Sequence, residues 1–102
     1  MTWTPHSLEQ VENVLRAEQS KLSADERTKF ARVKVPIRKV PCFRSEQYAD
    51  DGLFLVADDG TTAVFFDDVD EEFAFCESKN LGKIVRRWTL VGSLSSALMK
   101  LS

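Results

Sequence analysis

Residues 53–66 read Leu-Phe-Leu-Val-Ala-Asp-Asp-Gly-Thr-Thr-Ala-Val-Phe-Phe, which is two apolar runs on either side of a polar turn. The dipeptide Asp59-Gly60 is typical of a two-residue type I′ turn, because that turn needs positive φ at both central residues. We therefore expect a β-hairpin, and both of its faces are apolar, as in central strands that are covered on both sides. The predicted cross-strand pairs are Asp58 with Thr61, Val56 with Ala63, and Phe54 with Phe65.

Two helices are predicted ahead of this hairpin. Apolar residues recur at three- and four-residue steps across residues 8–22, with charged residues between them. The first helix begins either at Thr4-Pro5 or at the capping box Ser7–Gln10. A second capping box, Ser23–Glu26, predicts a short helix over residues 24–31.

Three further strands and one helix complete the pattern. A strand begins at Val33, and its prolines place it at a sheet edge or at a bulge, because proline donates no ladder hydrogen bond. Strands are predicted at residues 72–77 and 84–91, and a short helix with one apolar stripe at residues 94–101. We expect one α+β domain over residues 1–102, in the order α-α-β-β-β-β-β-α. It is an antiparallel five-stranded meander sheet with two N-terminal helices and one short C-terminal helix.

Charge is strongly segregated along the chain, although the formal net charge is only −2. Residues 45–77 hold eleven acidic side chains and no lysine or arginine. Residues 16–44 hold nine basic and three acidic side chains, and residues 78–102 hold five basic and no acidic ones. The acidic run is the most distinctive feature of the sequence.

The predicted hairpin gathers part of this acidic run at one end of the sheet, opposite the Asp59-Gly60 turn. The carboxylates expected there are Asp50, Asp51, Asp67, Asp68, Asp70, Glu71 and Glu72. Clustered carboxylates steer a cationic partner, so we expect these residues to bind a basic protein. A divalent-metal site is the first alternative, because Ca²⁺ and Mg²⁺ take clustered oxygen ligands, but the spacing does not fit an EF-hand. A solvated acidic rim, neutralised by flanking lysines and arginines, is the structural alternative.

A nucleic-acid interface is the second alternative function. Seven basic side chains could follow a phosphate backbone, with Phe43 available for stacking: Arg27, Lys29, Arg32, Lys34, Arg38, Lys39 and Arg44. The acidic run would oppose the same polyanion. We therefore expect these cations to serve as internal counter-charges and as gatekeepers of the sheet edge.

No enzymatic signature is present. His6 is the only histidine, no serine or cysteine lies in a nucleophile motif, and the four glycines are isolated. We expect no cofactor and no catalysis. Cys42 and Cys76 lie 34 positions apart without a Cys-x-x-Cys motif, so we expect two reduced thiols.

The sequence also bears on location and assembly. Its longest uncharged stretch, residues 88–99, has 12 residues, which is too short to cross a bilayer, and the N-terminus lacks a secretory pattern. We expect a small cytoplasmic, non-enzymatic binding protein of the inhibitor or immunity type. If the helices leave the hairpin face with Phe54, Val56, Ala63 and Phe65 uncovered, a second subunit in a homodimer or another protein would cover it.

Overall fold

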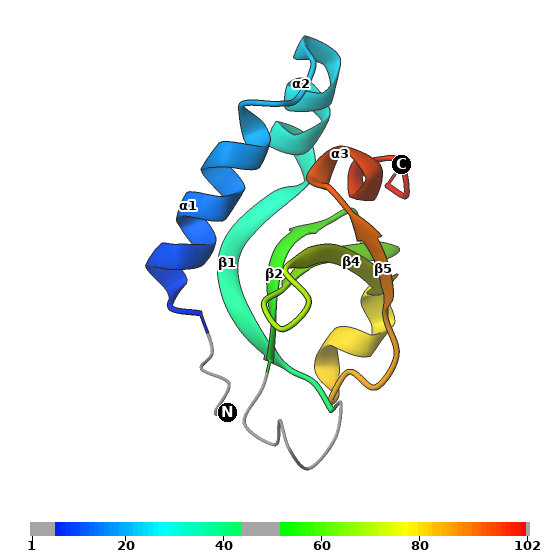
Figure 1. The fold of residues 1–102 in the computed structure, drawn as a ribbon. Coiled ribbons are helices and arrows are strands. Elements are labelled where there is room, and N and C mark those ends of the chain that lie inside the picture. The colour runs from blue at the N-terminus through cyan, green and yellow to red at the C-terminus, as the bar shows by residue number, and fades with distance from the viewer. Residues whose placement is uncertain (1–5, 44–51, 102) are drawn as a thin grey trace.

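The computed structural model describes residues 6–43 and 52–101. Its elements are α1 (Leu8–Gln19), α2 (Ala24–Val33), β1 (Lys34–Pro41), β2 (Gly52–Asp58), β3 (Thr62–Asp67), β4 (Glu72–Glu77), the 3₁₀ helix η2 (Ser78–Gly82), β5 (Thr89–Gly92) and α3 (Leu94–Leu98). The strands form one sheet in the order β1-β2-β3-β4-β5, and every neighbouring pair is antiparallel. The predicted α+β meander is confirmed (Figure 1).

Both N-terminal helices begin at capping boxes. Ser7 caps α1: its hydroxyl accepts the Gln10 N–H, and the Gln10 side chain accepts the Ser7 N–H. Ser23 and Glu26 cap α2 in the same way. These reciprocal bonds satisfy amides that have no partner inside a helix, which explains why the local sequence locates both starts. The alternative start at Thr4-Pro5 lies outside the described residues.

The first strand follows α2 without a loop. α2 runs to Val33, two residues further than predicted, and β1 begins at Lys34. β1 pairs only with β2, and its register shifts between Lys34 and Arg38, where Pro36 lies. Both expectations from the prolines, an edge strand and an irregular ladder, are confirmed.

The predicted hairpin register is wrong. In the structure the pairs are Asp58 with Ala63, Ala57 with Val64, Leu55 with Phe65, and Phe54 with Phe66. The connection is a three-residue loop, residues 59–61, in which Gly60 alone has positive φ, so it is not a type I′ turn. The Asp59 carboxylate accepts the N–H groups of Thr61 and Thr62, and this side-chain capping stabilises the wider loop.

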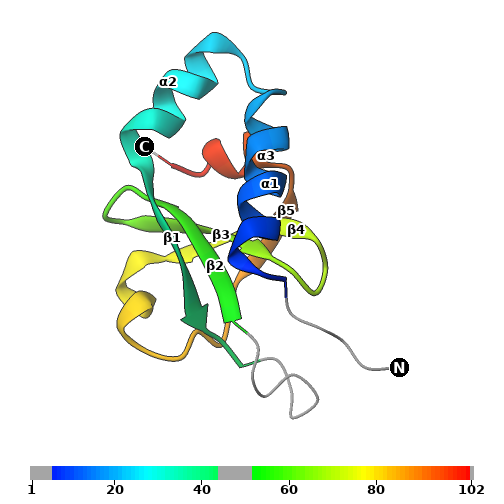
Figure 2. The ribbon, with the colours of Figure 1, turned by 90° about the vertical axis from the view of Figure 1, so that its left-hand side faces the viewer.

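The sheet separates two hydrophobic cores. One core lies between the sheet and the helices and includes Val11, Phe30, Phe66 and Leu98. The other lies on the opposite face and includes Leu55, Phe65, Cys76 and Val85. In both ribbon views the sheet curves strongly, α1 and α2 lie on one side of it, and η2 lies at the end of the molecule away from α2 (Figures 1 and 2).

A backbone bridge joins the end of β1 to the chain that leads into β5. Val85 forms an isolated parallel bridge with Cys42: its N–H donates to the Pro41 carbonyl, and its own carbonyl accepts the Phe43 N–H. The predicted strand at residues 84–91 is therefore wrong at its start, since β5 begins only at Thr89. Val85 is buried while Arg86 and Arg87 beside it are exposed, so this segment does not alternate like a sheet strand.

The chain covers its own sheet. None of the four hairpin residues that motivated a homodimer is more than 3% exposed. α3 is shorter than the predicted helix, but the apolar stripe that begins at Leu94 and ends at Leu101 is fully buried. Within the described ranges, no helix is both long and apolar enough to span a membrane.

Candidate functional site at the acidic β3–β4 turn

The structure places five of the seven predicted carboxylates, and they do not form one exposed cluster. Asp50 and Asp51 lie outside the described residues. Asp67 and Asp68, at the end of β3, are buried, with 0% and 2% exposure. Asp70 and Glu71 are exposed, and Glu72 is half-buried at the start of β4. We call residues 67–72 the acidic turn.

Asp67 is a structural acceptor rather than a surface charge. Its Oδ2 accepts a hydrogen bond of 3.0 Å from the Trp88 indole Nε1. Its Oδ1 accepts the Val69 and Asp70 N–H groups at 3.0 and 3.3 Å. One carboxylate therefore fixes the turn and ties it to the segment before β5. An expected partner-binding role for Asp67 is inconsistent with this burial.

Asp68 points to the other face of the sheet, because successive strand side chains alternate. Its Oδ2 accepts the His6 backbone N–H at 2.9 Å and lies 3.9 Å from the imidazole Nδ1. The His6 ring packs edge-on against Phe66, with ring centroids 5.8 Å apart. Asp68 thus holds the entry to α1 against the sheet and is likewise withdrawn from surface contact.

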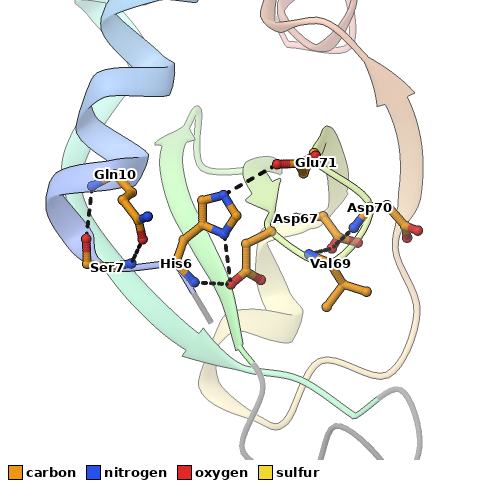
Figure 3. A network of polar contacts seen from close by, with 8 residues as sticks. His6, Ser7, Gln10, Asp67, Val69, Asp70 and Glu71 are labelled. Atoms are coloured by element: carbon orange, nitrogen blue, oxygen red, sulfur yellow. Dashed lines mark hydrogen bonds and ion pairs between the residues drawn. The ribbon is translucent and has the colours of Figure 1, made fainter. Parts of the chain in front are cut away.

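Glu71 is the exposed end of the same network. Its Oε1 lies 3.6 Å from the His6 Nε2, and the Glu71 side chain is 72% exposed (Figure 3). Glu71 has a φ of 55°, the only positive value at a non-glycine residue in the part of the chain described. Residues 70–72 therefore directly follow two buried carboxylates, Asp67 and Asp68, which hold the backbone of the turn from opposite faces of the sheet.

The contacts of His6 in the described residues are with backbone, ring and carboxylate groups. The Ser7 hydroxyl is engaged in capping α1, and across residues 6–43 and 52–101 no hydroxyl or thiol bonds to the His6 imidazole. In the same ranges no group of three or more histidine, cysteine, aspartate or glutamate side chains could hold a metal ion. No pattern in the sequence indicates the contacts of His6 with Asp68 and Glu71.

Cys42 and Cys76 form no disulfide and are buried in the second core. Burial, together with the neighbouring charges of Glu77 and Asp58, raises the pKa of the Cys76 thiol to about 11. Because the thiolate is the nucleophile, Cys76 is almost entirely protonated and unreactive at neutral pH. The expectation of reduced thiols is confirmed for both residues.

The basic segment at residues 27–44 is partly used inside the molecule. Arg27 donates to the Gln19 and Ser20 carbonyls at the end of α1, each at 3.4 Å. Lys29 donates to the Leu101 carbonyl at 2.7 Å. Four of the other cations are exposed, and Arg44 lies outside the described residues. The contacts of Arg27 and Lys29 use backbone carbonyls rather than carboxylates, so the expected role of these cations as counter-charges stays a prediction.

One feature of the sequence indicates that Asp67 and Asp68 are buried. Both follow Phe65-Phe66 on a strand with two apolar faces, so continued alternation sends one carboxylate into each core. The partners, Trp88 and His6, lie 21 and 62 positions away, which no local pattern specifies.

Comparisons of the chain with protein-family models, curated proteins and solved structures found no match.

Proposed function

We propose that this protein is a small, non-enzymatic binding module that uses the exposed part of the acidic turn against a basic protein. The observation that carries this proposal is the rigid display of Asp70, Glu71 and Glu72. They follow one another on a turn whose preceding residues are anchored in both cores. The role is that of an inhibitor or immunity-type protein, for which fast, charge-steered association is useful.

Preorganisation supports the proposal. A flexible acidic loop would lose conformational entropy when a partner ordered it, which weakens binding. Here Asp67 fixes two turn amides before any partner arrives, and Glu71 already has its left-handed backbone conformation. The carboxylates can therefore meet cationic side chains with little further ordering. Expected partners present lysine or arginine, and membranes and nucleic acids are not expected ligands of this surface.

The experiment compares two variants that each lose three negative charges. The test variant is Asp70→Asn, Glu71→Gln and Glu72→Gln, and the control is Glu9→Gln, Glu12→Gln and Asp25→Asn on the exposed helix surfaces. Each protein is used to capture partners from its native lysate. A captured basic protein is then purified and titrated by calorimetry. We expect the test variant to bind at least about tenfold more weakly than wild type, with a smaller change for the control.

Salt dependence gives a second readout. Binding by wild type should weaken between roughly 0.1 and 0.5 M salt, because surface charges are screened over the Debye length. Equal affinity of wild type and the test variant would overturn the proposed surface. Capture of the chain alone, insensitive to salt, would overturn the binding-module function.

A further inference from the structure

The basic residues after η2 line a cavity of about 470 Å³. Its lining residues are Asn80, Lys83, Ile84, Arg86 and Arg87. Three of these five side chains are cationic and all three are exposed. In the ribbon views, η2 and the chain after it lie at the opposite end of the molecule from α2 (Figures 1 and 2).

The cations of this cavity are not neutralised within the described residues. Across residues 6–43 and 52–101, Lys83, Arg86 and Arg87 form no ion pair, whereas neighbouring Lys79 pairs with Glu77 at 2.9 Å. Arg86 lies over the exposed Phe43 ring, 5.3 Å from its centroid, which orients the guanidinium without cancelling its charge. Three like charges close together are unfavourable in isolation, and an anion would relieve that repulsion.

The backbone holds these side chains in place. Val85, between Ile84 and Arg86, is 1% exposed and is bridged to the end of β1 by two hydrogen bonds of 2.9 and 3.0 Å. On the other side, the Lys83 N–H donates to the Asn80 carbonyl and closes η2. The backbone of this segment is thus anchored at its centre and its start before any ligand binds.

We propose that this cavity binds a compact, phosphate-bearing small molecule. Arginine forks match phosphate oxygens in a bidentate fashion, and lysine adds a point charge. The volume is that of a small-molecule site. Ile84, 52% exposed, supplies an apolar contact for the rest of such a ligand.

A compact ligand fits the surroundings better than a polymer. The adjoining cavity shares Asn80 and Arg87 with this one, and it is lined by Glu77 as well. A nucleic-acid strand running beyond the three cations would meet that carboxylate and a chain that is acidic overall, with a sequence pI near 5.4. A phosphate group held between Arg86 and Arg87 would not meet the Glu77 carboxylate.

Calorimetric titration of the full chain tests the proposal. The probes are inorganic pyrophosphate, a nucleoside diphosphate, citrate as a non-phosphate anion, and a 20-nucleotide oligothymidylate. The test variant is Arg86→Gln with Arg87→Gln, and Arg32→Gln, an exposed cation on α2, is the control. We expect saturable binding of pyrophosphate and the nucleoside diphosphate, weakened at least about tenfold in the test variant and unchanged in the control.

Amide chemical shifts should change around residues 80–87 when pyrophosphate is added. Binding that is undetectable for both phosphate probes, or that survives in the test variant, would overturn the site. Equal or tighter binding of citrate would overturn phosphate recognition, and tighter binding of the oligothymidylate would assign the surface to nucleic acid instead. The proposed protein partner plays no part in these titrations, so either proposal can fail alone.

Discussion

The acidic turn and the basic residues around the η2 cavity are opposite in charge and also opposite in how the fold uses that charge. In the acidic turn, Asp67 and Asp68 are buried and accept hydrogen bonds from three separate parts of the chain. Around the cavity, Lys83, Arg86 and Arg87 are exposed and form no ion pair within the described residues. The first set stabilises the fold, and the second set is available to a ligand.

This difference follows from side-chain chemistry. A carboxylate is short and accepts several hydrogen bonds, so it can satisfy backbone amides and an indole N–H where a strand ends. Lysine and arginine are long, and their charged ends remain in water while their stems pack. A run of like charge in a sequence therefore does not by itself identify a binding surface, because burial removes some of its members.

The largest expected effect is on stability, from Asp67→Ala. The change removes the acceptor of three hydrogen bonds, one of them from the half-buried Trp88 indole. We expect the free energy of unfolding to fall by about 4 kcal/mol, and chemical denaturation measures it. Arg87→Gln is the corresponding change in the basic region, and it should lower the free energy of unfolding by less than about 0.5 kcal/mol. Similar losses for both variants would contradict the comparison.

Alkylation of Cys76 tests whether the acidic or the basic side chains near it dominate the electrostatic potential at its thiol. Cys76 lines the cavity that adjoins the basic one, yet its pKa is raised to about 11 by burial and by Glu77 and Asp58. At pH 8 we expect its alkylation to be about 90-fold slower in the folded protein than in the unfolded chain, since the pKa rises from 9.0 to about 11. Peptide-resolved mass spectrometry of iodoacetamide labelling follows this rate. Labelling at the unfolded rate would show that the arginines dominate instead.

A double-mutant cycle isolates the bond between the turn and the segment before β5. Trp88→Phe removes the indole N–H but keeps an aromatic ring, and it should cost about 1.5 kcal/mol. Combined with Asp67→Ala, the total loss should be smaller than the sum of the single losses by about 1 kcal/mol. Additive losses would mean that the two side chains stabilise the fold independently.

The smallest effect concerns a carboxylate outside the turn. The Ser23 backbone N–H, followed by the Ser95 hydroxyl, lowers the pKa of Glu26 below 4.5. A lowered pKa stabilises the fold above about pH 4.5, and this contribution is lost as the pH falls through the folded value. Ser95→Ala should raise the pKa of Glu26 toward 4.5, as followed by NMR titration. An unchanged pKa would show that Ser95 does not contribute.

Local residues determined much of the fold. The Ser23 capping box located the start of α2, and the Ser7 capping box was one of two starts predicted for α1, because the interacting groups of such a box lie within three positions of each other. The strand over residues 72–77 was predicted at its observed bounds from its apolar pattern and flanking charges. The hairpin was predicted in kind but not in register, since the Asp59 side chain stabilises a wider loop than the Asp-Gly signal implies.

By itself, the sequence determined the order of elements, the edge position of β1 and the segregation of charge. Only the tertiary structure decided that Asp67 would meet Trp88, that Asp68 would meet His6, and that Val85 would bridge to Cys42. Caps, turns and hydrophobic periods depend on residues a few positions apart, so a linear reading can find them. Burial and long-range pairing depend on how the strands register and how the sheet curves. Those features are set when segments that lie far apart in the sequence pack into the same core.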